Sequence, residues 1–68
     1  MAKLNTAPNI ADGDGFYAEL LAAHEGLSDD QSSAFNARLI LLLANHVGDR
    51  EVLTDALTKA AAAARDRA

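Results

Sequence analysis

The sequence predicts an all-α fold of three helices, at about residues 14–25, 29–47 and 50–65, behind an extended N-terminal arm at residues 1–13. Apolar residues recur at helical spacing within each of the three segments. Aspartate or serine precedes each segment, and glycine follows the first two, as is typical of helix starts and stops. There is no internal repeat and no linker, so residues 1–68 form a single domain.

The arm contains Pro8, which disfavours helix immediately before it, and several residues typical of turns. Its sizeable apolar residues beyond Met1 are Leu4 and Ile10. Two outcomes stay open: these side chains anchor the arm on the helices, or the arm is a disordered tail.

Asp14 is the favoured N-cap of the first helix, with Asp12 as the alternative. The helix has an apolar stripe and ends before Gly26; the stripe comprises Phe16, Tyr17, Leu20, Leu21 and His24. A calcium loop around Gly15 is not expected. It would require an acidic residue at position 10 and a glutamate at position 21, where Ile10 and Leu21 stand.

The central helix is the dominant element. Ser28 and Gln31 have the spacing of a capping box, and Gly48 follows as a stop. A helical wheel gives it two apolar faces. We expect the two flanking helices to pack against and cover the first face, which comprises Phe35, Leu39, Leu42, Leu43 and His46. The second face, roughly opposite, comprises Ala37, Ile40, Ala44 and Val47, with Leu41 at its edge.

We expect a second copy of the chain to cover the second face, which predicts a homo-oligomer, most simply a dimer. Of 34 hydrophobic residues 16 are alanine, so the core is thin, and without cysteine no disulfide can reinforce it. The alternative is a closed three-helix monomer. The predicted interface residues are Ile40, Leu41, Ala44, Val47, Arg38 and Asn45.

Asp49 is the expected cap of the third helix, and Asp55 and Lys59 have the spacing of a favourable ion pair. The residues expected on its inward face are Val52, Leu53, Ala56, Leu57, Ala60 and Ala64. The end of the chain, Arg65 to Ala68, is expected to fray.

The polar candidates for a site are His24, His46 and Asp49. A metal ion or a small molecule bound at a dimer seam is one interpretation, and Asp49 would then orient the His46 ring. The other is that each histidine interacts with the dipole at its own helix end. No cofactor is expected.

The remaining polar residues of the central helix also have alternative roles. One role for Arg38 is to bind a carboxylate or phosphate group of a ligand. The other is an ion pair within or between chains, for which Asp29, Asp30 and Glu19 are the candidates. Asn36 and Asn45 are expected to form hydrogen bonds across a helix interface.

The net charge of −4 is uneven. Residues 1–34 hold one base and six acids, and residues 35–68 hold five bases and four acids. An acidic chain without a basic cluster is a poor nucleic-acid binder. The longest apolar run is too short to span a bilayer, and the first residues lack an apolar signal core, so we expect a cytoplasmic protein. The sequence shows no nucleophile–base pair, and we do not expect an enzyme.

Several strings together resemble a family of short bacterial proteins known as a domain of unknown function. They are residues 4–10 (Leu-Asn-Thr-Ala-Pro-Asn-Ile), 14–17 (Asp-Gly-Phe-Tyr), 23–24 (Ala-His), 26–28 (Gly-Leu-Ser) and 36–49, from Asn36 to Asp49. The resemblance implies gene neighbourhoods for aromatic-compound breakdown, beside flavin-dependent hydroxylases. It assigns no functional residue.

These observations together predict a small helical interaction protein that self-associates through its central helix, with a larger enzyme as a further partner. The resemblance implies that this protein is an accessory subunit of a catabolic oxidoreductase. The alternative is a small-molecule- or metal-binding module with its site at a dimer seam.

Overall fold

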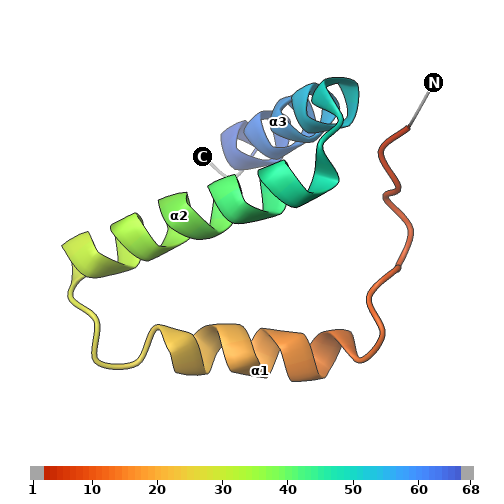
Figure 1. The fold of residues 1–68 in the computed structure, drawn as a ribbon. Helices are drawn as coiled ribbons and strands as arrows, with labels where there is room; N and C mark the ends of the chain where they lie inside the picture. Colours follow the sequence, from red (N-terminus) through yellow and green to blue (C-terminus); the bar gives the residue numbers. More distant parts are fainter. Residues whose placement is uncertain (1–2, 67–68) are drawn as a thin grey trace.

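The computed structural model describes residues 3–66, which form three helices: α1 (Gly13–Ala23), α2 (Asp29–Val47) and α3 (Arg50–Arg65). The predicted all-α, three-helix fold is confirmed. Residues 3–10 form neither helix nor strand, as expected for the arm, and Figure 1 shows them rising from the start of α1. Within the arm, Leu4 is half-buried and Ile10 is exposed. Of the residues expected to fray, Arg65 is the last residue of α3 and Asp66 is its C-cap, whereas positions 67 and 68 lie outside the described residues.

The first helix begins one residue earlier and ends two residues earlier than predicted. Its N-cap is Asp12, not the favoured Asp14, because Asp12 adopts a left-handed conformation (φ 54°) in which its carboxylate accepts a hydrogen bond from the Gly15 N–H at 3.1 Å. At the other end, the N–H groups of His24 and Glu25 bond carbonyls three residues back. That tighter turn closes α1 before Gly26.

The ends of α2 and α3 are confirmed. The Ser28 hydroxyl accepts from the Gln31 N–H at 3.2 Å, and the Gln31 side chain accepts from the Ser28 N–H at 3.0 Å. Gly48 ends α2 in the left-handed region (φ 72°), which costs glycine little. Asp49 then caps α3, accepting from the Val52 N–H at 3.1 Å.

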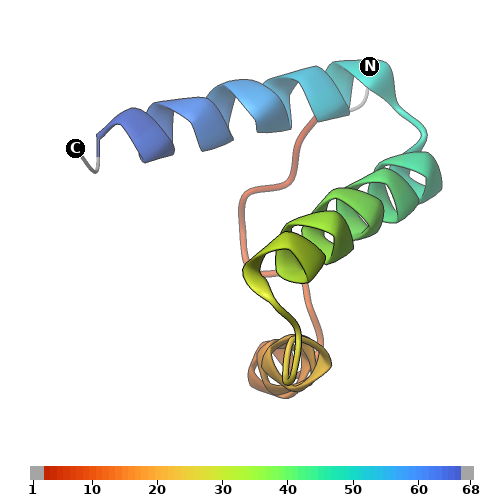
Figure 2. The same ribbon diagram turned by 90° about the vertical axis from the view of Figure 1, so that its left-hand side faces the viewer.

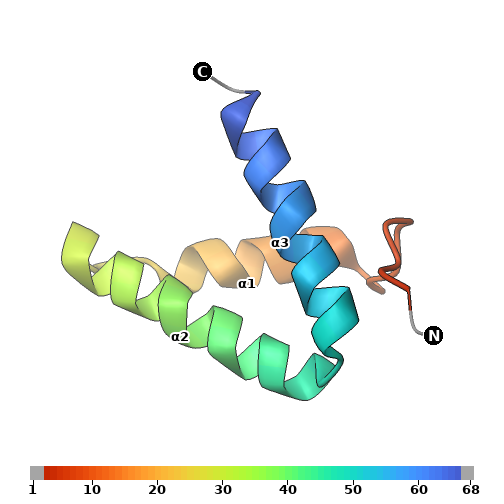
Figure 3. The same ribbon diagram turned by 90° about the horizontal axis from the view of Figure 1, so that it is seen from above.

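The helices do not close around a common core. Figures 1 and 2 show α1 beneath α2 and running in roughly the opposite direction. After Gly48, α3 crosses α2 at a wide angle, and Figures 2 and 3 show its C-terminal half extending clear of the other two helices. No residue between 3 and 66 is buried. The closed three-helix alternative is therefore not the arrangement of this chain.

The molecule is larger than a compact chain of its length. Its radius of gyration is 13.8 Å, against about 11 Å for a compact 68-residue domain. Its accessible surface is 6065 Å², whereas a compact monomer of 7.1 kDa exposes about 4,100 Å². The chain therefore exposes roughly 2,000 Å² more surface to water than a compact monomer of the same mass.

The flanking helices were expected to cover the first face of α2, and they cover it only in part. Phe35 and Leu39 are half-buried, but Leu42 and Leu43 remain 64% and 53% exposed. Figures 2 and 3 show α3 diverging from α2 after Gly48. Within residues 3–66, no helix has the length and apolar character needed to cross a bilayer.

Candidate interaction surface on the central helix

The uncovered face of α2 is defined here by Ile40, Leu41 and Val47. Their exposed fractions are 62%, 66% and 49%, and Ala44 between them is half-buried. Ile40, Ala44 and Val47 stand four and three residues apart, so they share one side of the helix. Such contiguous aliphatic exposure is uncommon in monomers and typical of association surfaces.

A shallow groove of about 390 Å³ runs along another side of α2, toward its N-terminal half. It is lined by Leu27, Gln31, Ala34, Phe35, Arg38, Leu39 and Leu42. Leu27, Phe35 and Leu39 are half-buried, whereas Arg38 and Leu42 are exposed. The groove is therefore an open apolar channel with one guanidinium in its lining.

Arg38 has no carboxylate partner among the described residues. The ion pair that forms in residues 3–66 joins Lys59 Nζ and Asp55 at 3.1 Å, as predicted from their spacing. The intrachain pairs considered for Arg38, with Asp29, Asp30 or Glu19, are therefore not formed. A partner from outside the chain remains the open alternative. Asn45, on the same side of α2, is exposed, and its side chain forms no hydrogen bond within the described part.

His24 connects α1 to α2. Its Nδ1 lies 2.8 Å from the Leu20 carbonyl oxygen, and its Nε2 lies 2.9 Å from the Asn36 amide oxygen. Its ring meets the Phe35 ring edge to face, with centroids 4.4 Å apart. The expectation that Asn36 forms a hydrogen bond across a helix interface is thus confirmed, whereas Asn45 forms none.

Both oxygens beside His24 accept hydrogen bonds, so together they favour a ring with a proton on each nitrogen. The Leu20 carbonyl, and after it the Asn36 amide, raise the pKa of His24 above its usual value, while partial burial opposes them. Of these two contacts, the one with Leu20 is local to α1, and the one with Asn36 joins the end of α1 to α2.

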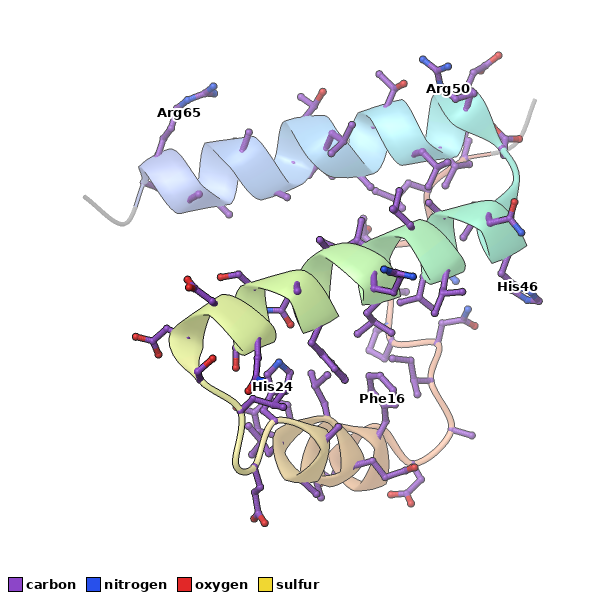
Figure 4. All side chains as sticks on the ribbon, turned by 60° about the vertical axis from the view of Figure 1, so that its left-hand side comes forward. Phe16, His24, His46, Arg50 and Arg65 are labelled. Carbon is purple, nitrogen blue, oxygen red and sulfur yellow. The ribbon has the colours of Figure 1, made fainter. Side chains whose placement is uncertain are left out.

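The other polar candidates lie apart from His24. Figure 4 shows His46 near the far end of α2 from His24. Asp49 is half-buried and accepts the capping hydrogen bond of α3, and within residues 3–66 it forms no hydrogen bond with His46. Residues 3–66 contain no group of three histidine, cysteine or acidic side chains placed to hold a metal ion.

The sequence did not indicate that Leu27, Gln31 and Ala34 line a groove. A partial signal was present, because positions 31, 34, 38 and 42 are spaced by three or four residues along one side of α2, whereas Leu27 lies in the preceding turn. The sequence also did not indicate that His24 would pair with Asn36. It follows from an antiparallel hairpin, in which the end of one helix lies beside the beginning of the next.

Comparison with known protein families identifies a match. A family model described as a protein of unknown function (DUF2783) matches residues 4–63. The chain belongs to this family. The resemblance drawn from the sequence is thereby confirmed for nearly the whole chain. No curated protein and no solved structure matches it.

Proposed function

We propose that this DUF2783 chain is a small helical interaction protein, not an enzyme, which self-associates through the uncovered face of α2. The observation that carries the proposal is the exposure of Ile40, Leu41 and Val47 on a helix whose two ends are fixed by local caps. A helix fixed in this way presents the three side chains as one continuous surface.

The amount of exposed surface supports a second copy as the partner. A standard interface buries about 800 Å² per partner, and homodimers often bury more. This chain exposes roughly 2,000 Å² more surface than a compact monomer of the same mass would. Burial of that surface by a second copy would give an interface of the size found in obligate homodimers. Isologous contact between two such chains would cover apolar surface that neither chain covers alone.

The test is the molar mass in solution, measured by light scattering over a range of protein concentration. We expect twice the 7.1 kDa of one chain. Ile40→Asp should shift the population to monomers, because it places a charge at an apolar contact. Thr58→Asp, at an exposed position of α3, is the matched control and should leave the mass unchanged. A monomer at all concentrations would refute the proposal.

We further propose, from the family resemblance, that the assembled form is an accessory subunit of a larger cytoplasmic enzyme, a catabolic oxidoreductase. Affinity purification from a native host followed by mass spectrometry tests this role. Recovery of an oxidoreductase with the wild-type chain supports it. Recovery of the chain alone contradicts it and leaves self-association as the proposed function.

A further inference from the structure

The polar side chains that line the groove on α2 present hydrogen-bond donors. They belong to Gln31 and Arg38, and the other lining residues are apolar. The Gln31 Oε1 already accepts the Ser28 N–H in the capping box, and its Nε2 forms no hydrogen bond within residues 3–66. The Arg38 guanidinium, which can only donate, has no carboxylate partner in the same part of the chain. The groove is therefore complementary to an occupant that supplies acceptors, above all a carboxylate facing the guanidinium.

The length and openness of the groove favour a helix as that occupant. Its lining on α2 runs from Gln31 to Leu42, which spans about 16 Å, or three turns of helix. More than half of the lining residues are exposed, so the groove would not enclose a small molecule as ligand pockets do. An extended strand would place unpaired backbone N–H and C=O groups against the apolar side chains, whereas a helix pairs its own backbone groups.

The groove stays uncovered in the proposed dimer. It lies on the Phe35 side of α2, roughly opposite the face of Ile40, Leu41 and Val47. A twofold dimer that forms through that face leaves one groove open on each chain. A helix that fills the groove therefore comes from a different protein.

We infer that the groove binds an amphipathic helix of another protein, whose aliphatic side chains cover Phe35, Leu39 and Leu42. A carboxylate of that helix pairs with Arg38. Gln31 lies about two turns from Arg38, so a helix lying along α2 would bring a second acceptor to the Gln31 amide from a position seven residues away from the carboxylate. The charge pair fixes the register and disfavours basic helices. This inference rests on the proposed role as an interaction protein and names the chemistry of its further partner.

Two designed helical peptides of about four turns test the inference. Both carry leucines at helical spacing; one has two glutamates seven residues apart at the edge of the leucine stripe, and the other has lysines at the same two positions. Fluorescence anisotropy should show that wild type binds the glutamate peptide about tenfold or more tightly than the lysine peptide. Arg38→Glu should reverse that preference. Leu42→Asp should weaken the binding of both peptides, because it places a charge at an apolar contact.

Arg50→Glu is the matched control, because Arg50 is an exposed arginine that points away from α2 in Figure 4. It should leave the preference for the glutamate peptide unchanged. If wild type binds the two peptides equally, or binds neither, the inference is wrong, and Ile40→Asp still tests self-association separately.

Light scattering distinguishes this inference from the proposed self-association. Arg38→Glu should have the same molar mass as wild type, because Arg38 lies outside the dimer contact. If Arg38→Glu converts a wild-type dimer to monomers, a second copy occupies the groove and the inference is wrong. A wild-type monomer that prefers the glutamate peptide would support the inference and refute self-association alone.

Discussion

Truncation of Ile40 measures how much a second copy contributes to covering α2. The Ile40 side chain is 62% exposed, so its own chain covers the smaller part of it. Complete burial of an isoleucine is worth about 1.5–3 kcal/mol, so covering the 62% that is exposed contributes about 1–2 kcal/mol per chain. A symmetric dimer contains two such side chains. Ile40→Ala should therefore weaken dimerisation by about 2–4 kcal/mol, or roughly 30- to 700-fold in the dissociation constant.

Sedimentation velocity over a dilution series gives that constant for wild type and variant. Leu53→Ala is the matched control, because Leu53 is half-buried by its own chain. It should lower the free energy of unfolding of the monomer and change the dissociation constant less than Ile40→Ala does. A wild-type dimer whose dissociation constant changes less than threefold in Ile40→Ala would refute the assignment of Ile40 to the interface.

Three further predictions concern the helix ends and the histidine. Ser28→Ala removes one half of the capping box and should lower the free energy of unfolding by about 1 kcal/mol, or about 4–8 °C in Tm by circular dichroism. Gly48→Ala forces a side chain into the left-handed region (φ 72°) and should cost about 1–2 kcal/mol in urea unfolding. The pKa of His24 is raised on folding, so the stability it contributes is fully present below its unfolded pKa and is lost as pH rises through the folded pKa. Asn36→Leu should bring that pKa down, as NMR titration of the ring measures.

Two of these predictions have a control variant. Gly13 lies in α1 with open space around its Cα, so Gly13→Ala should be neutral or stabilising, in contrast to Gly48→Ala. An equal loss at both glycines would contradict the conformational argument. In His24→Gln the pH dependence between the two pKa values should disappear. If it persists, another group produces it, and the link between His24 and Asn36 is not responsible.

The ends of α2 and α3 could be predicted because their caps involve residues close in sequence. Ser28 and Gln31 are three residues apart, as are Asp49 and Val52, so the residue types alone specify the bonds. The start of α1 was predicted less well. Two aspartates compete there, and the choice depends on the left-handed backbone of Asp12, which residue types do not reveal.

The angles between the helices could not be predicted from the sequence, because they depend on contacts between distant residues. The wheel identified two apolar faces on α2, and both do carry exposed side chains. It did not show that α3 would diverge and leave Leu57 70% exposed. The groove was missed for the same reason. Its lining combines a residue of the α1–α2 turn, Leu27, with one side of α2, and their proximity depends on the path of the turn.

Under the proposed self-association, the exposed apolar surface of a single chain would make the lifetime of the chain depend on its abundance. If folding is completed by a second molecule, the fraction of protected chains rises with the amount synthesised, by mass action. Chains made in excess of their partners, or made too slowly to meet one, present unshielded aliphatic side chains to cellular proteases. Expression level would then act as a threshold, below which the polypeptide is cleared and above which it accumulates.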